Sequence, residues 1–116
     1  MQEENTIIQG FIVDLRRGTL VLAVLSCLNT AKYGYSLLQD MENSGIKIEA
    51  STLYPLLRRL ESQGLLKSEW DTTQSRPRKY YSISENGVKI YAQLRAEWQR
   101  ITTEMTNLLN QSQEEI

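Results

Sequence analysis

The segment that decides the fold runs from Ser51 to Leu66 and reads STLYPLLRRLESQGLL. Four of its leucines are spaced at i, i+3, i+4 and i+7, which is one face of an α-helix; they are Leu53, Leu56, Leu57 and Leu60. Gly64 follows this face and predicts the end of the helix, because glycine adopts the left-handed conformation without steric cost. We therefore expect a helix over residues 50–63 that buries its leucines and exposes its polar side.

The start of this helix has two possible positions. Ser51 could act as the N-cap, which would keep Pro55 near the first turn, where proline is tolerated. The helix could instead begin at Glu49 with a slightly irregular first turn. The sequence leaves both interpretations open.

Two further helices are expected on the N-terminal side. The run LRRGTLVLAVLSCL at residues 15–28 is apolar almost all round, which predicts a helix packed on several sides. A second helix is expected over Tyr35–Asn43, ended by Gly45, with a short connection over residues 46–49. Residues 1–10 are interpreted as a loose or helical leader, and no role is assigned to residues 1–14.

The C-terminal side predicts a hairpin and one long helix. Strand-like segments at residues 66–70 and 78–83 flank the polar loop DTTQSRP, in which Pro77 is the last residue. Ser84 is a candidate cap for the last helix. That helix carries apolar residues spaced alternately by three and four: Tyr91, Leu94, Trp98, Ile101, Met105 and Leu108.

This heptad seam is expected to form a dimer interface. Residues 88–111 would span about 36 Å at the rise of an α-helix, more than a small three-helix domain can cover. The simplest partner is a second copy of the chain. The seam could also pack on the helix expected over residues 15–28, and both arrangements can hold together. The residues favour Trp98 as an interface anchor over the wall of a pocket for a flat apolar ligand.

The order helix, helix, helix, hairpin, long helix predicts a mainly α fold, a winged helix-turn-helix with a long C-terminal dimerisation helix. In such a fold the third helix enters the major groove of DNA and the hairpin follows the backbone. The face opposite the leucines carries Ser51, Pro55, Arg58 and Ser62, with Tyr54 and Arg59 on its flanks. The competing interpretation is an ordinary solvated helix face.

Charge is concentrated in this region. The whole chain has a net charge of −1, whereas residues 50–79 carry six basic and three acidic side chains. Three of the basic residues, Arg76, Arg78 and Lys79, lie at the hairpin tip, where phosphates could be reached, although charged turns also serve solubility. A basic patch on an acidic body favours one specific polyanion contact.

Composition argues against an enzyme. The chain has no histidine and one cysteine, Cys27, within an apolar run. It shows no glycine-rich phosphate loop and no carboxylate cluster, so we expect no catalytic residue, no metal and no cofactor. A single thiol fits a reducing, cytoplasmic setting. No secretory signal is evident, and the apolar run 20–28 is too short to span a membrane.

Four segments resemble the PadR family of bacterial transcriptional regulators, and the resemblance covers roughly residues 15–110. They are LRRGTL at 15–20, YGYSLLQDM at 33–41, STLYPLLRRLESQGLL at 51–66 and RKYYSISENG at 78–87. The resemblance implies a winged-helix domain over residues 1–84 and a dimerisation helix over residues 85–116. It also implies repression at a palindromic promoter element, often beside the regulator's own gene.

The resemblance also assigns roles to residues. It implies a DNA-facing group, to which the helix-face analysis adds Arg59: Tyr35, Ser51, Thr52, Tyr54, Pro55, Arg58, Arg76, Arg78 and Lys79. Trp98 matches an aromatic position that, in members similar to multidrug-sensing regulators, stacks on planar drugs. The single long C-terminal helix is similar to the smaller subgroup of the family. One departure is the hairpin tip, where the common Gly-Arg-Arg-Lys-Tyr-Tyr is replaced and Pro77 removes a charge and a donor.

The resulting expectation is a cytoplasmic homodimer that binds a pseudo-palindromic operator and is released by a small aromatic or hydrophobic molecule. The alternative is a winged-helix protein–protein adaptor without sequence-specific DNA binding. The adaptor would tolerate removal of the charges on Arg58, Arg76, Arg78 and Lys79, whereas the regulator would not.

Overall fold

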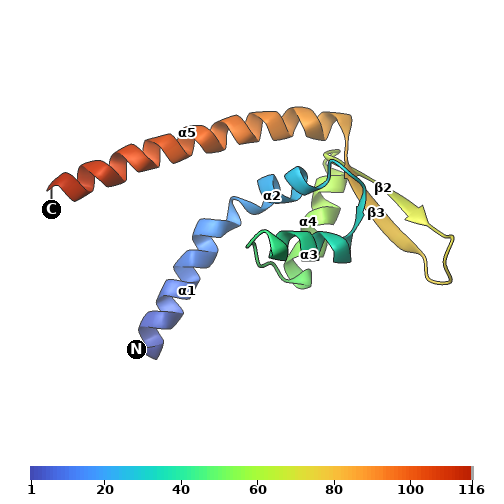
Figure 1. The fold of residues 1–116 in the computed structure, drawn as a ribbon, viewed down its shortest axis with the longest axis horizontal. Coiled ribbons are helices and arrows are strands. Elements are labelled where there is room, and N and C mark those ends of the chain that lie inside the picture. Colours follow the sequence, from blue (N-terminus) through green and yellow to red (C-terminus); the bar gives the residue numbers. More distant parts are fainter. Residues whose placement is uncertain (116) are drawn as a thin grey trace.

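The computed structural model describes residues 1–115, and the side chains of residues 1–111. The elements follow the order α1 (Gln2–Arg17), α2 (Leu20–Cys27), β1 (Lys32–Tyr33), α3 (Gly34–Asn43), α4 (Ala50–Ser62), β2 (Leu66–Asp71), β3 (Arg78–Ile83) and α5 (Glu85–Glu115). Helices α2, α3 and α4 gather beside the base of a small sheet, the β2–β3 hairpin extends to one side, and α1 and α5 extend to the other (Figure 1). This is the predicted winged helix-turn-helix with a long C-terminal helix.

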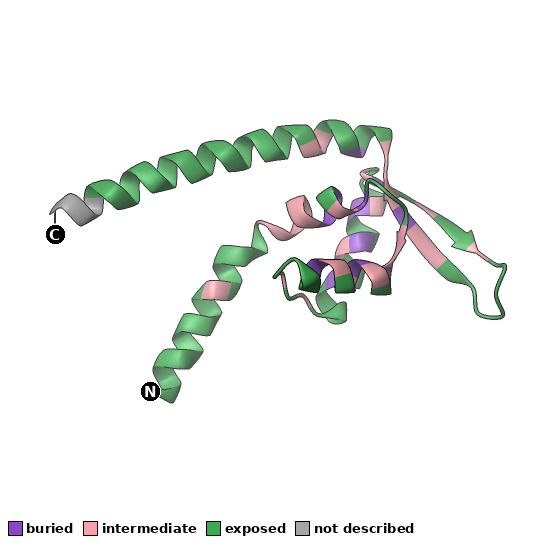
Figure 2. Cartoon of the chain, in the orientation of Figure 1, coloured by how far each residue is buried: buried purple, intermediate pink, exposed green. Residues whose placement is uncertain are grey.

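The core lies between these three helices and the sheet. It is formed by apolar side chains that are almost fully buried (Figure 2), namely Val24, Leu25, Leu28, Leu37, Met41, Leu53, Leu57, Leu60, Leu66 and Tyr81. Three of the four leucines that define the apolar face of α4 are among them, and the fourth, Leu56, packs at the edge. Burying this face fixes which side of α4 remains exposed.

Two helices end at glycines, as predicted. Gly45 and Gly64 have φ values of 89° and 81°, in the left-handed region that favours glycine. The residues after them close the helix ends, because the backbone N–H of Ile46 donates to Met41 O at 2.8 Å and that of Leu65 to Leu60 O at 2.9 Å. Both ends have the 6→1 bond of a Schellman motif.

The hydrogen bonds in the first turn of α4 show which of the two possible helix starts is the actual one. Glu49 is the N-cap residue, and its carbonyl oxygen accepts from the backbone N–H groups of Thr52 and Leu53 at 3.0 and 2.9 Å. Ser51 lies inside the helix and is not the cap. Pro55 consequently lies in the second turn, where it lacks the N–H that would donate to Ser51.

The prediction of one continuous helix over residues 15–28 is wrong, because these residues are divided between α1 and α2. The chain leaves the helix at Gly18 and Thr19, where the Thr19 N–H and hydroxyl both donate to Arg16 O, at 3.0 and 2.8 Å. Glycine disfavours helix, and a threonine hydroxyl competes for backbone carbonyls. Residues 15–17 belong instead to α1, which also contains most of the predicted leader, and only the part after Gly18 packs in the core.

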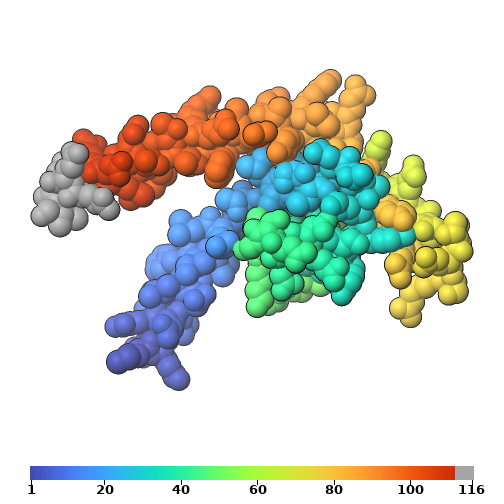
Figure 3. All heavy atoms as spheres, in the orientation of Figure 1, coloured from blue at the N-terminus to red at the C-terminus, as the bar shows by residue number. Residues whose placement is uncertain are grey.

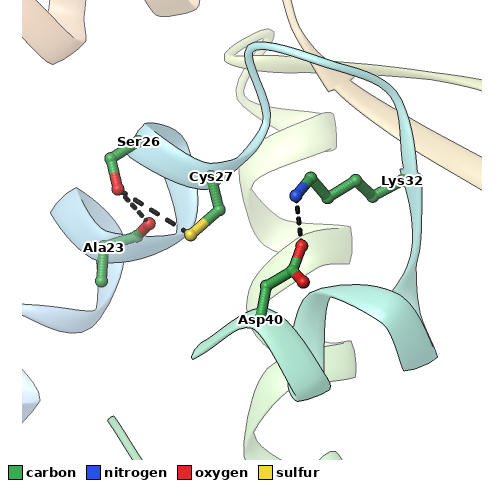
Figure 4. Close-up of polar contacts among 5 residues, drawn as sticks. All are labelled: Ala23, Ser26, Cys27, Lys32 and Asp40. Carbon is green, nitrogen blue, oxygen red and sulfur yellow. Dashed lines mark hydrogen bonds and ion pairs between the residues drawn. The ribbon is translucent and has the colours of Figure 1, made fainter. Parts of the chain in front are cut away.

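A short strand that the sequence analysis missed completes the sheet. The strand order is β1–β3–β2, with both pairs antiparallel, and Tyr33 opposite Tyr80. Lys32 of β1 forms an ion pair with Asp40 of α3, which joins the strand to that helix (Figure 4). The same view shows Ser26 bonded to Ala23 O at 2.6 Å beside Cys27, which is half-buried against the core. Two residues give no periodic pattern, which explains why β1 escaped prediction.

The hairpin and α5 are joined to the core by local hydrogen bonds. Leu66 pairs with Ile83 and Asp71 with Arg78, so the loop is residues 72–77, and Asp71 belongs to the strand rather than to the expected loop. Ser84 caps α5, since its hydroxyl accepts from the Gly87 N–H at 2.9 Å and donates to Gly64 O at 2.7 Å. The capping role predicted for Ser84 is confirmed.

Candidate nucleic-acid interface

A groove of about 510 Å³ lies between the hairpin and the N-terminal part of α3 with α4 behind it. Its lining contains five of the ten residues predicted to face DNA, together with aromatic neighbours: Tyr33, Gly34, Tyr35, Ser36, Tyr54, Trp70, Arg76, Arg78, Lys79 and Tyr81. The tertiary structure thus brings together side chains from three separate segments of the sequence. Aromatic rings and guanidinium groups on one open face suit a polyanion with flat bases.

Tyr54 of α4 lies directly on Gly34, the first residue of α3. A Cβ atom added at Gly34 would stand 2.4 Å from Tyr54 Cε1 and 2.8 Å from its hydroxyl oxygen, so only glycine leaves room for the ring. Tyr54 remains 36% exposed in this position. Tyr35, the next residue of α3, is exposed, and its hydroxyl accepts from Gln39 Nε2 at 3.1 Å.

A stack of rings supports Arg78. The Tyr33 and Tyr80 rings lie 3.9 Å apart between centroids, and the Arg78 guanidinium carbon lies 5.1 Å from the centroid of Tyr33. This distance is within the range of a cation–π contact. The neighbouring Tyr80 side chain, followed by burial and the hydrogen bond to Asp71, raises the pKa of Tyr33 above its usual range. Arg78 is therefore held at the edge of the groove by an aromatic surface.

Asp71 fixes the base of the hairpin loop. Its carboxylate accepts from the Thr73 hydroxyl at 2.6 Å, from the Thr73 N–H at 3.0 Å and from the Tyr33 hydroxyl at 2.9 Å. These bonds, the Thr73 hydroxyl first, lower the pKa of Asp71. One carboxylate thus links the loop that carries Arg76 to the stack that carries Arg78.

Lys79 differs from the two arginines because its charge is already paired. Its Nζ lies 3.0 Å from Glu61 Oε1 of α4 and 5.1 Å from the Tyr81 ring centroid. The Ser68 hydroxyl donates to the other oxygen of Glu61. Ser68 first and Lys79 second lower the pKa of Glu61, and the bond to Glu61 raises the pKa of Lys79. Lys79 and Glu61 thus tie the hairpin to α4.

The remaining predicted residues lie outside the groove. Ser51, Pro55 and Arg58 are exposed on α4. Thr52 lines a separate hollow of about 380 Å³ shared with the C-terminal part of α1. Arg59 lines a hollow of about 390 Å³ beside Trp98. The structure therefore separates Arg59 and Thr52 from the groove.

Several groove residues were missed by sequence reasoning. Tyr33 and Gly34 stand in the quoted segment YGYSLLQDM, and Trp70 and Tyr81 in the two strands, but none was assigned to the site. The available signal was the spacing of the aromatic residues along the strands. This spacing indicates a shared aromatic surface only when β1 is known to pair with β3.

The apolar seam of α5 is open in the single chain. Tyr91 packs at the edge of the core, whereas Leu94, Trp98, Ile101, Met105 and Leu108 are exposed. Trp98 is 46% exposed and lines two hollows of about 390 and 550 Å³, both of which include residues of α2. The seam is therefore partly covered by α2, as the alternative interpretation expected, and its distal part is uncovered.

Among the described residues, no group of three or more histidine, cysteine, aspartate or glutamate side chains could hold a metal ion. No helix within residues 1–115 is both long and apolar enough to span a membrane.

The chain is similar to several known proteins. The family model described as "Transcriptional regulator PadR-like family" matches residues 21–93. A PadR family transcriptional regulator from Eggerthella lenta is 46% identical, with a TM-score of 0.90, over 94% of this chain and 97% of that chain. A transcriptional regulator from Clostridium thermocellum is 32% identical, with a TM-score of 0.74, over 81% and 95% of the two chains.

A further match is to a curated transcriptional regulator of Mycobacterium tuberculosis. It is 38% identical over 55 residues, which are 47% of this chain and 51% of that protein. The alignment thus spans about half the length of this curated relative.

Proposed function

Because the chain belongs to the PadR-like family of transcriptional regulators, we propose that it binds a pseudo-palindromic DNA operator as a homodimer and represses transcription there. The observation that carries this proposal is the groove in which Tyr35, Tyr54, Arg76 and Arg78 converge beside the exposed face of α4. DNA as the target also implies a cytoplasmic location.

In this proposal α4 enters the major groove. Its buried leucines fix the orientation of the helix, so that Ser51, Pro55 and Arg58 face outward. An arginine in the major groove can donate two hydrogen bonds to guanine O6 and N7. Tyr54, resting on Gly34, and Tyr35 would contact the sugar–phosphate backbone or a base edge beside it.

The hairpin would follow the DNA backbone. Arg76 in the loop and Arg78 on the Tyr33 stack are exposed and supply the phosphate contacts. Lys79 lines the same groove, but its ion pair with Glu61 gives it mainly a positioning role. Pro77 lies between the two arginines and stiffens the tip.

Dimerisation would use α5. The proposed dimerisation segment is residues 85–116, of which α5 covers Glu85–Glu115 and residue 116 lies outside the described part, and the proposed DNA-binding domain with its N-terminal helix is residues 1–84. The exposed seam from Leu94 to Leu108 is complementary to a second copy of itself. Pairing would present two copies of α4 to half-sites about one helical turn of DNA, or a multiple of it, apart.

A ligand response is part of the same proposal. Trp98 stands between two hollows that a dimer would enclose further, and an indole ring offers a flat surface for a planar apolar molecule. Such a molecule would release DNA by changing the angle between the two α5 helices. Titration with planar dyes tests this idea: unchanged Trp98 fluorescence at saturating dye would exclude it.

The test of DNA binding uses the fragment upstream of the protein's own gene in anisotropy titrations over a range of salt concentrations. Arg58→Gln, Arg76→Gln and Arg78→Gln should each weaken binding, by about tenfold for a lost base or phosphate contact. The two hairpin variants should also reduce the slope of log K against log salt by about one each.

Arg100→Gln is the matched control. It removes the same charge from an exposed residue of α5 that pairs with Glu97 at 2.6 Å, away from the groove. It should bind like the wild type. If the wild type and all four variants bind the fragment equally, or none of them binds it, the adaptor described above is favoured and the proposal fails.

A further inference from the structure

A second basic cluster lies outside the groove. It borders the hollow of about 380 Å³ between the C-terminal part of α1 and the segment that joins α3 to α4, two parts of the chain that lie side by side in Figure 3. Three residues that line this hollow are basic and one is acidic: Arg16, Arg17, Lys47 and Glu49. The three basic residues form the second basic cluster, and none of them lines the groove.

The charges of the second basic cluster are open to a ligand. All three basic residues are exposed, and among the described residues neither Arg16 nor Lys47 forms an ion pair. Arg17 lies 3.5 Å from Asp14, but both side chains are more than half exposed, and such surface pairs contribute little. A polyanion can therefore approach the cluster without displacing a buried partner.

The position of Thr52 connects the second basic cluster to the exposed face of α4. Successive residues of an α-helix are turned by about 100°. Thr52 and Tyr54 consequently lie on opposite sides of Leu53, which is fully buried. Tyr54 lines the groove, whereas Thr52 lines the hollow. The groove and the second basic cluster thus flank the exposed face of α4 on its two sides.

A helix in the major groove of DNA has a phosphate backbone on each side. The major groove is about 12 Å wide, and an α-helix with its side chains measures about 10–12 Å, so both backbones are within reach of residues at the flanks of the helix. Arg76 and Arg78 lie on the groove side of α4, where they can contact one backbone. The backbone on the other side of α4 faces the second basic cluster.

We propose that Arg16, Arg17 and Lys47 bind phosphates of the DNA strand that lies across the major groove from the hairpin, so that α4 is held between contacts to both backbones. This inference rests on the DNA binding of the proposed function and adds a surface to it. Phosphate contacts fix the position of a protein on the duplex and carry no sequence information of their own. The second basic cluster thus sets the angle at which α4 enters the major groove.

The test compares Lys47→Gln and Arg17→Gln with the wild type in anisotropy titrations on the fragment upstream of the protein's own gene. Each variant should raise the dissociation constant about three- to tenfold and reduce the slope of log K against log salt by about one. Lys89→Gln is the matched control, because Lys89 is exposed on α5 and lines neither the groove nor the hollow. This variant should stay within about twofold of the wild type.

Ethylation interference on the same fragment locates the contacts. Ethylation neutralises single phosphates, so a phosphate bound by one side chain interferes with the wild type but not with the variant that lacks that side chain. Within each half-site, Lys47→Gln should lose interference on one strand and Arg78→Gln on the other. Loss of interference on the same strand for both variants overturns the inference.

All substituted side chains are exposed, so the variants should fold, which circular dichroism checks. If the wild type binds the fragment while Lys47→Gln and Arg17→Gln match Lys89→Gln in affinity and salt slope, only this inference fails. A loss of affinity without a lower salt slope also overturns it, since a lost phosphate contact must change the release of counterions. If the wild type binds no DNA, the proposed function fails and this inference fails with it.

Discussion

Tyr54 shows how a single residue of the interface depends on a missing side chain elsewhere. The tyrosine extends from α4, and its ring occupies the space that a Cβ atom of Gly34 would fill. No hydrogen bond to the Tyr54 hydroxyl contributes among the described residues, so its position depends on this steric fit. Gly34 therefore acts as a positioning residue for the groove.

Gly34→Ala should weaken operator binding without unfolding the protein. The new methyl group would collide with the end of a side chain that is 36% exposed and can swing outward, so the fold survives while Tyr54 leaves the groove. We expect operator affinity to fall about tenfold, with a stability loss of about 1 kcal/mol, the lower end of overpacking costs. Anisotropy and urea titrations measure the two effects.

Gly10→Ala is the control for this prediction. Gly10 lies in α1 with no atom within 4 Å of an added Cβ, and alanine favours helix. This variant should bind DNA as the wild type does. Wild-type affinity in Gly34→Ala would show that the position of Tyr54 does not matter for binding.

At the scale of elements, the hairpin is held on α4 by Glu61. The carboxylate accepts from Ser68 of β2 and pairs with Lys79 of β3, so it contacts both strands. The folded-state pKa of Glu61 lies below its ordinary value of 4.5, so its contribution to stability is complete above pH 4.5 and is lost as the pH falls through the lowered value. The pKa of Lys79 is raised above its ordinary value of 10.5. Its contribution to stability is therefore complete below pH 10.5 and is lost as the pH rises through the raised value.

Glu61→Gln should remove part of this acid dependence. Urea unfolding at neutral pH and below pH 4.5 should show a smaller difference for the variant than for the wild type. A double-mutant cycle with Lys79→Gln should give a coupling energy below about 1 kcal/mol, because both side chains are partly exposed. Glu69→Gln on the exposed side of β2 is the matched control. Equal acid profiles for Glu61→Gln and wild type would contradict the assignment.

A close backbone contact helps to fix the start of α5. A Cβ atom at Gly87 would lie 2.1 Å from Leu65 O, in the turn that joins α4 to β2. The Ser84 N–H donates to the same oxygen at 3.0 Å. Helix α5 thus leaves the domain in one direction only.

Gly87→Ala should be strongly destabilising. Backbone atoms cannot move aside as Tyr54 can, so the first turn of α5 must shift, at a cost of about 1–3 kcal/mol. Thermal unfolding measures this loss, and the variant should also dimerise poorly. Gly18→Ala, with no atom within 4 Å of the added Cβ, serves as the comparison. A melting temperature for Gly87→Ala equal to that of the control would refute the prediction.

At the scale of the whole molecule, α1 and the distal part of α5 carry exposed apolar side chains. The chain's dimensions of 62 × 37 × 23 Å reflect helices that extend beyond the core. Trp98, midway along the exposed seam, is the largest side chain available to the proposed dimer interface, and such aromatic residues often dominate association.

Trp98→Ala should therefore raise the dimer dissociation constant at least about thirtyfold, as expected for a central aromatic anchor. Mass photometry over a dilution series would measure it. Trp70→Ala is the matched control, because Trp70 is 64% exposed on the hairpin, away from α5. A dissociation constant for Trp98→Ala similar to that of the Trp70 variant would remove Trp98 from the interface.

The sequence by itself determined α3, α4, the hairpin and α5, and the order in which they follow one another. The leucine spacing of α4, the glycines that end α3 and α4, the alternation in the hairpin and the heptads of α5 are local patterns. Each depends on residues only a few positions apart, and each element is present in the structure. The ends of the helices were predicted to within one or two residues where a glycine or Ser84 marked them. The break at Gly18 was missed, because the apolar character of the run outweighed one weak local signal.

Only the tertiary structure decided which of the candidate residues lie together. The groove depends on a two-residue strand, on the fit of Tyr54 over Gly34 and on the pairing of Lys79 with Glu61, which are 18 positions apart. Pairings between distant segments are set by how the buried faces of α2, α3 and α4 pack, and no local pattern encodes the result. For the same reason the sequence grouped Arg59 with the interface, whereas the orientation of α4 places it beside Trp98.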